Sequence, residues 1–318
     1  GSSNVFQDTD NSIAGRAYLR CSKTYRTELK EPTPGKRTFV RVEGASVRAI
    51  VAVNGREVGV HRGPFTAFTY EITGFLREHD NVLEIVVDNF YDADTLPRSG
   101  DYTVQGGLYR PVHLIETPLV CLDPAGADFG PGVTVETDAV SGRVRAEPLV
   151  TRVKGTETNE VRVTFTVAET GESGESPSFV VRGFRRWSPE DPAVYHLRVR
   201  LSSAFGEDEV TLPFGFAACE LRKDGFYLNG KKRFVRGVNY HQERTGKGWA
   251  ITPEDIDEDL ALIREMGADG IRTTHYPHSR AFFEKADRAG FLVWTELPAT
   301  DKVGRSARYR ENLMACVR

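Results

Sequence analysis

Four side chains that could hydrogen-bond a substrate or exchange protons with it lie within one stretch of the chain. They are His241, Arg272, His275 and Glu296. An imidazole can donate one hydrogen bond while accepting another, a guanidinium only donates, and an ionised carboxylate only accepts. Each of the four ends or follows a short apolar run, as polar residues do where a buried strand reaches the surface. Their types and spacing therefore predict a polar site at the ends of strands.

The elements that must position these residues are three strands separated by helices. RFVRGVNYH (233–241), GIRT (270–273) and FLVWTELP (291–298) are largely apolar and rich in β-branched or aromatic residues, as buried parallel strands are. The alternation of strand and helix patterns predicts a parallel α/β unit. In (β/α)₈ barrels the chemistry lies at the carboxyl ends of the strands, and the four polar residues fall at those ends.

Helices are predicted between and after these strands. Thr252 is a good N-cap, Pro253 suits the first helical position, and Asp255 can complete a capping box. A second helix is predicted over about 279–289, and a third over 306–318.

The chain upstream of this unit consists of short strand patterns broken by turns. Residues from about 18 to 116 show no helical pattern, and Asn54-Gly55 is a strong hairpin signal. A second β-rich stretch from about 118 to 214 has the strand density of an immunoglobulin-like sandwich. Trp187, within it, is predicted to be a packing residue. The sequence thus predicts two β-sandwiches followed by an α/β unit.

Three long segments in this order resemble the opening barrel segments of family 2 glycoside hydrolases, most closely their β-galactosidases. The segments are GVNYHQERTGKGWAIT (237–252), EDLALIREMGADGIRTTHYPHS (258–279) and AGFLVWTELP (289–298). Upstream, residues 51–76 and 106–114 resemble the sugar-binding sandwich that opens chains of that family. The resemblance covers nearly all of this chain, but only the N-terminal portion of such an enzyme.

The resemblance implies a multidomain fold. Residues 1–117 would form a jelly-roll sugar-binding β-sandwich, residues 118–214 an immunoglobulin-like β-sandwich, and residues 215–318 the first part of a (β/α)₈ TIM barrel. Three strands of eight cannot close a barrel, and an open remnant exposes strand edges. We therefore expect the chain to be a truncated piece, or a second copy of it to cover the open edge in a homo-oligomer.

The resemblance also implies roles for particular residues. The substrate-binding residues would be Asp101, His241, Arg272 and His275, and Glu243 and Glu296 would line the pocket. A carboxylate at Asp101 could accept sugar hydroxyls and hold a monovalent cation, although an Asx-type turn would also explain it. Neutral imidazoles could orient a sugar ring without placing a charge beside it.

The function implied is the retaining hydrolysis of terminal β-D-galactosides. That mechanism needs two carboxyl groups about 5–5.5 Å apart, and in the family both are glutamates on later barrel strands. We assign neither catalytic glutamate to a residue of this chain, so the 318-residue chain is predicted to be inactive by itself. The alternatives are a β-glucuronidase of the same family and a non-catalytic carbohydrate-binding fragment.

Composition argues against several other functions. The net charge of −3 is unlike the basic excess of a nucleic-acid-binding surface. No apolar run approaches the length of a membrane span, so a location in the bacterial cytoplasm or periplasm is expected rather than a membrane. The four cysteines form no CxxC pair, and the H-x-x-H pattern of His275 and His278 has no carboxylate ligand close in sequence, so no metal site is predicted.

Overall fold

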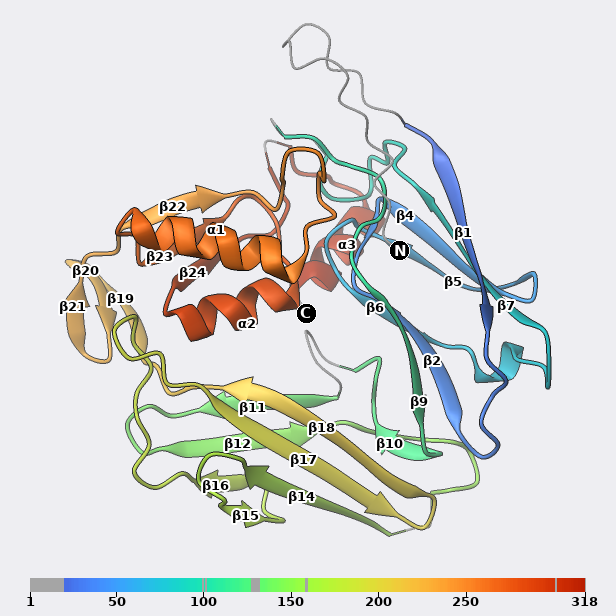
Figure 1. Cartoon of the computed structure of the whole chain (residues 1–318), viewed down its shortest axis with the longest axis horizontal. Coiled ribbons are helices and arrows are strands. Elements are labelled where there is room, and N and C mark those ends of the chain that lie inside the picture. The colour runs from blue at the N-terminus through green and yellow to red at the C-terminus, as the bar shows by residue number, and fades with distance from the viewer. Residues whose placement is uncertain are drawn as a thin grey trace, which may run out of the picture.

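The computed structural model describes residues 20–317, apart from residues 99, 101, 127–131, 158–159 and 301. Three regions follow one another along the chain (Figure 1). The N-terminal sheets (β1 to β9) lie on one side, the middle sheets (β10 to β18) lie below, and a C-terminal α/β unit (β19 to α3) lies above the middle sheets.

The N-terminal sheets are antiparallel, in the strand orders β1-β7-β4-β5, β6-β2-β9 and β3-β8. Their elements are β1 (Ser22–Leu29), β2 (Arg37–Val42), β3 (Ala45–Ser46), β4 (Arg48–Val53), β5 (Arg56–Arg62), β6 (Phe68–Glu71), a 3₁₀ turn (Thr73–Phe75), β7 (Asn81–Asp88), β8 (Gly107–Leu108) and β9 (Val112–Thr117). Asn54 and Gly55 join β4 to β5 with φ values of 54° and 75°, the left-handed pair that a tight hairpin requires. The predicted hairpin is confirmed.

The middle sheets are also antiparallel, in the orders β15-β14-β17-β18, β11-β12-β16 and β10-β13. Their strands are β10 (Val120–Leu122), β11 (Val133–Thr137), β12 (Arg143–Pro148), β13 (Val150–Arg152), β14 (Val161–Val167), β15 (Ser173–Gly174), β16 (Ser178–Val180), β17 (Tyr195–Ser203) and β18 (Gly206–Phe214). On β17 the side chains of Leu197, Val199 and Leu201 are buried while the residues between them are not. This period of two places one face of the sheet on an apolar core.

The C-terminal unit begins with an antiparallel hairpin sheet and continues as a parallel sheet, β22-β23-β24. Its elements are β19 (Cys219–Arg222), β20 (Gly225–Leu228), β21 (Lys231–Arg233), β22 (Gly237–Tyr240), α1 (Pro253–Glu265), β23 (Gly270–Thr273), α2 (Arg280–Ala289), β24 (Leu292–Thr295) and α3 (Ala307–Val317). The predicted parallel α/β unit is confirmed. None of the helices in the described part of the chain is both long and apolar enough to cross a lipid bilayer.

The start of α1 forms as predicted. Asp255 donates its backbone N–H to the Thr252 hydroxyl, and the Asp255 carboxylate accepts the Thr252 N–H at 2.8 Å, which completes the capping box. Hydrogen bonds from Lys247 and from the Thr252 backbone lower the pKa of Asp255. The helix buries Ile256, Leu260 and Ile263. Capping and apolar spacing thus hold α1 against the parallel sheet.

The single strand predicted over 233–241 is wrong in extent. It is two strands: β21 ends at Arg233 and β22 begins at Gly237. Residues 231–233 pair antiparallel with β20, whereas residues 237–240 pair parallel with β23. The chain changes partner between them, and Asp269 fixes this corner by accepting hydrogen bonds from the Arg233 side chain and the Arg236 backbone.

Candidate functional site

The predicted strand-end residues Arg272, His275 and Glu296 lie together in one hydrogen-bonded group. Glu296 Oε1 accepts from Arg272 Nε at 2.6 Å, and Glu296 Oε2 lies 3.1 Å from Arg272 Nη2 and 3.0 Å from His275 Nδ1. Arg272 is on β23, His275 follows β23, and Glu296 follows β24. Parallel pairing of these two strands brings the three side chains to one edge of the sheet.

The charge of Glu296 is stabilised by this group. Burial acts to raise the pKa of Glu296, but hydrogen bonds from Arg272 and His275 outweigh burial, so the pKa lies below its ordinary value. Glu296 is therefore an ionised acceptor at neutral pH. It neutralises the Arg272 guanidinium and holds the His275 ring in place.

His241, at the end of β22, joins the same edge of the sheet. Its ring centroid lies 5.8 Å from that of His275, with the ring planes at 82°. His241 Nδ1 lies 3.0 Å from the hydroxyl of Tyr276, a fully buried residue. The two predicted histidines thus stand side by side, and each has a neighbour fixed at its Nδ1 atom. Tyr276 directly follows His275 in the segment 258–279, but no role was predicted for it from the sequence.

The remaining predicted site residues are Glu243 and Asp101. Glu243 accepts a hydrogen bond from Gln105 Nε2 at 3.2 Å, so it lies where β22 meets the loop before β8. Asp101 lies outside the described residues, and its role and the cation expected beside it stay predictions. Its neighbour Tyr102 places its ring 5.6 Å from His241 and 5.2 Å from Tyr276. Tyr102 therefore lies at the strand-end site.

An aromatic cluster lies behind the histidines and joins the N-terminal sheets to the α/β unit. It consists of Phe65, Tyr109, Trp249 and Tyr276, all buried. The rings of Phe65 and Tyr276 stack at 4.2 Å with an angle of 7° between their planes. These four residues come from four different loops of the chain, and together they give the histidine site a rigid apolar support.

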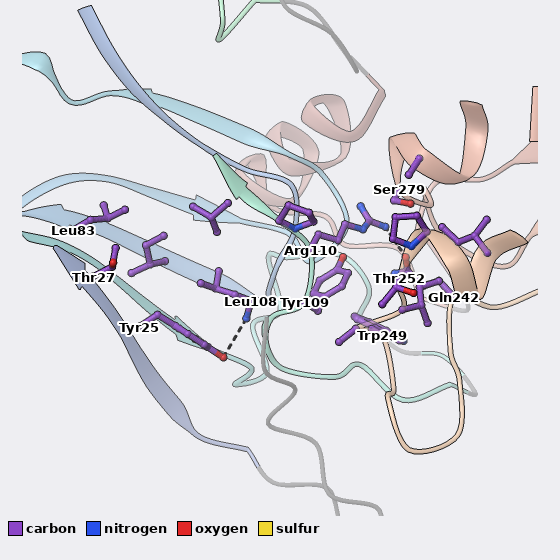
Figure 2. A pocket seen from close by; sticks show the side chains of 18 of the residues that line it. Tyr25, Thr27, Leu83, Leu108, Tyr109, Arg110, Gln242, Trp249, Thr252 and Ser279 are labelled. Atoms are coloured by element: carbon purple, nitrogen blue, oxygen red, sulfur yellow. Dashed lines mark hydrogen bonds between the residues drawn. The ribbon is translucent and has the colours of Figure 1, made fainter. Parts of the chain in front are cut away.

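Arg110 stabilises the contact between the N-terminal sheets and the α/β unit with hydrogen bonds (Figure 2). Its guanidinium donates to the carbonyl oxygens of Phe65 at 2.8 Å and Pro277 at 3.1 Å. It also donates to Gln242 Oε1 at 2.6 Å, and both of these side chains are labelled in Figure 2. Arg110 is 8% exposed. Gln242 and Pro277 directly follow the site histidine His241 and the cluster tyrosine Tyr276, so this one side chain ties the ends of β22 and β23 to the N-terminal sheets.

Two cavities of substrate size flank this region. The cavity in Figure 2, of about 600 Å³, lies between the N-terminal sheets and the start of α1, and Leu108, Arg110 and Trp249 are among its lining residues. The other, of about 680 Å³, lies between the middle sheets and the α/β unit, and Glu296 contributes to it. Within the described residues, no three His, Cys, Asp or Glu side chains are grouped as metal binding would require.

Comparison with known protein families assigns the chain to a family. A model described as "Glycosyl hydrolases family 2, TIM barrel domain" matches residues 219–311, and one described as "Glycosyl hydrolases family 2" matches residues 132–216. The chain belongs to glycosyl hydrolase family 2. The resemblance predicted from the motifs is confirmed, and the family's mostly β architecture agrees with the observed sheets.

Relatives in this family carry two different names. The chain is 32% identical to a β-glucuronidase of Bacteroides fragilis over 96% of its own length and 48% of the relative's. It is 27% identical to a β-galactosidase of Thermoanaerobacterium thermosulfurigenes, over 89% and 42% of the two chains. A crystal structure of a Bacteroides uniformis β-glucuronidase matches with a TM-score of 0.83 and 30% identity, over 93% and 38%. The chain therefore spans about half the length of these relatives or less.

Proposed function

We propose that this chain forms one wall of the sugar-binding pocket of a retaining β-glycosidase. The observation that carries the proposal is the hydrogen-bonded group of Arg272, His275 and Glu296, with His241 beside it, at the carboxyl ends of parallel strands. In an α/β barrel this edge is where substrates bind. The substrate would be the terminal sugar of a β-linked glycan.

The site favours a terminal β-D-galactoside as the first candidate substrate. Arg272 directs two of its nitrogen atoms at Glu296, so its positive charge is already neutralised. The wall then presents imidazoles rather than a net positive charge, and imidazoles suit the hydroxyls of a neutral sugar. Asp101 would supply a further acceptor, and Glu243 and Glu296 would complete the lining.

A β-D-glucuronide is the second candidate. The B. fragilis and B. uniformis proteins are both named β-glucuronidases, and their identities to this chain are at or above 30%. Recognition of a glucuronate carboxylate requires an additional cationic or hydrogen-bond-donating group. In this alternative that group would come from another part of the pocket, since Arg272 is paired with Glu296.

Glu296 is a binding residue in this proposal and not the general acid. A general acid must hold its proton at working pH, which needs a raised pKa. The pKa of Glu296 is lowered, chiefly because Arg272 and His275 overcome the effect of burial. The two catalytic carboxyl groups are accordingly assigned to no residue here, and the 318-residue chain alone is expected to give no turnover.

The test is a comparison of aryl β-D-galactoside and aryl β-D-glucuronide hydrolysis by the full-length natural protein. Replacing His275→Gln is expected to lower kcat/KM at least about tenfold, because a hydrogen bond that strengthens in the transition state is lost. His196→Gln is the matched control, since His196 pairs with Glu169 on the middle sheets, away from the site. Faster cleavage of the glucuronide would select the second candidate.

Two results would contradict the proposal. Equal kcat/KM for His275→Gln and His196→Gln would remove the strand-end group from the pocket. Saturable sugar binding without hydrolysis of either glycoside by the full-length protein would replace the enzyme with a carbohydrate-binding protein.

A further inference from the structure

We propose that the neutral forms of the two site histidines are held in opposite tautomers: His241 carries its proton on Nε2, and His275 carries its proton on Nδ1. Tyr276 sets the first tautomer and Glu296 sets the second. The proposal concerns hydrogen positions that follow from the partners of each ring. Only its consequence for a sugar rests on the proposed function.

The tautomer of His275 follows from the group around its Nδ1 atom. Glu296 Oε2 lies at 3.0 Å and Arg272 Nη2 at 3.3 Å from that nitrogen. A bare nitrogen lone pair facing a carboxylate oxygen would be repelled, whereas an N–H facing it makes a charge-assisted hydrogen bond. Arg272 meanwhile has Glu296 itself as its acceptor. The proton therefore lies on Nδ1 and leaves Nε2 as an acceptor.

The tautomer of His241 follows from Tyr276. The Tyr276 hydroxyl is buried, and burial raises its pKa, so it keeps its proton at neutral pH. That proton needs an acceptor, and His241 Nδ1 lies 3.0 Å away. Nδ1 is therefore the bare nitrogen, and the proton of the neutral ring is on Nε2.

The consequence is a wall with one imidazole donor and one imidazole acceptor. The two rings are nearly perpendicular, with centroids 5.8 Å apart, so they would meet different hydroxyl groups of one sugar. A hydroxyl that accepts from His241 and another that donates to His275 are fixed in opposite roles. Such a pair discriminates between sugar epimers better than two equivalent rings, because a misplaced hydroxyl meets an unmatched group.

The experiment is a long-range ¹H–¹⁵N correlation spectrum of the ¹⁵N-histidine-labelled chain at pH 8. The sequence has seven histidines, and His241→Gln and His275→Gln identify the two signals needed. The expected result is a pyridine-type Nδ1 shift for His241 and a pyrrole-type Nδ1 shift for His275. A pyrrole-type Nδ1 at His241 in the unmodified chain would overturn the proposal without any further variant.

Tyr276→Phe tests the cause. Phenylalanine keeps the ring that stacks on Phe65 and removes only the hydroxyl, so His241 is expected to lose its pure tautomer while His275 keeps its own. Tyr240→Phe is the matched control, because the Tyr240 hydroxyl donates to Asp259 at 2.6 Å. An unchanged His241 spectrum in Tyr276→Phe would overturn the role of Tyr276. No substrate is involved, so loss of the proposed glycosidase function would leave this result standing.

Discussion

The α/β unit meets the N-terminal sheets and the middle sheets in two very different ways. Against the N-terminal sheets it buries an aromatic cluster and the Arg110 guanidinium, and Asn312 on α3 adds hydrogen bonds to the Leu96 N–H and the Arg62 carbonyl oxygen. A cavity lies at each contact, of about 600 Å³ against the N-terminal sheets and about 680 Å³ against the middle sheets, so the difference lies in the side-chain contacts. The polar contacts with the middle sheets are fewer among the described residues, and Trp187 Nε1 makes one of them by donating to the Asp287 carbonyl oxygen at 2.8 Å.

The close contact is the one that supports the candidate site. Phe65 and Arg110 come from the N-terminal sheets. They hold Tyr276, Gln242 and Pro277, which lie within two residues of His241 or His275. In the described part of the middle sheets, no contact matches the Phe65 stacking or the Arg110 hydrogen bonds beside the two histidines. We infer that the N-terminal sheets are part of the site, whereas the middle sheets mainly position the other two regions.

Replacing Arg110→Met should cause the largest loss of stability. Methionine cannot donate the hydrogen bonds of the Arg110 guanidinium, so several buried acceptors lose their donor. These include the Phe65 and Pro277 carbonyl oxygens and Gln242 Oε1. An unpaired buried acceptor costs about 1–3 kcal/mol, so we expect unfolding to become easier by about 3 kcal/mol or more. Urea denaturation measures this change in the free energy of unfolding.

The matched control for that change is Arg145→Met on the middle sheets. Arg145 forms an exposed ion pair with Glu147, and exposed pairs contribute about 0–1 kcal/mol. Similar losses in the two variants would show that the contact with the N-terminal sheets is no stronger than an ordinary surface pair, and the comparison between the two interfaces would fail.

Acidification should weaken the N-terminal contact next. Burial lowers the pKa of His61 on β5 to about 4, and a hydrogen bond to the Gly63 carbonyl only partly offsets it. In the unfolded chain His61 has the ordinary histidine pKa of about 6.5. Between pH 6.5 and pH 4, therefore, His61 binds a proton in the unfolded chain but not in the folded chain. Stability therefore falls as pH falls through this window, by about 3 kcal/mol at about 1.36 kcal/mol per pKa unit.

Urea denaturation at pH 7 and at pH 4 measures the effect. His61→Gln should reduce the difference in unfolding free energy between the two pH values, since glutamine does not titrate. His79→Gln is the control, because His79 is exposed and paired with the exposed Glu31. A pH dependence equal in all three proteins would show that His61 takes up its proton as readily when folded as when unfolded.

Local features of the fold could be predicted from the sequence, and long-range ones could not. The capping box at Thr252 and Asp255 and the bounds of β23 depend on a few consecutive residues, and both are confirmed. The hydrogen bonds of Arg110 join residues 132 and 167 positions apart, which no local pattern specifies. The strand error at 233–241 has the same cause, since the partner strand changes within an apolar run.

The same distinction between local patterns and long-range contacts applies to the site residues. Polar residues at strand ends were found because strand patterns and the family motifs are local. Tyr276 and Tyr102 were missed as neighbours of His241, because only the folded chain brings their rings to it. A conspicuous aromatic next to a candidate site residue is the signal that could have indicated them.

The smallest effect is expected at the looser contact, from Trp187→Phe. The indole is buried, as predicted for a packing residue, and its Nε1 hydrogen bond to the Asp287 carbonyl oxygen would be lost. The backbone beside Trp187 also packs closely against the end of α2. Gly290 ends α2 in the left-handed conformation, and a Cβ at Gly290 would lie 2.6 Å from the Pro189 carbonyl oxygen.

We expect Trp187→Phe to lower the free energy of unfolding by about 1 kcal/mol, the net contribution of one hydrogen bond. The kcat/KM of the full-length protein should stay within about twofold, because the indole supports neither site histidine. Tyr227→Phe is the matched control, since the Tyr227 hydroxyl donates to the exposed Asp224 carboxylate on the hairpin before the parallel sheet. A fall in kcat/KM well beyond twofold in Trp187→Phe, with the control unchanged, would mean that the middle sheets also hold the site histidines in place.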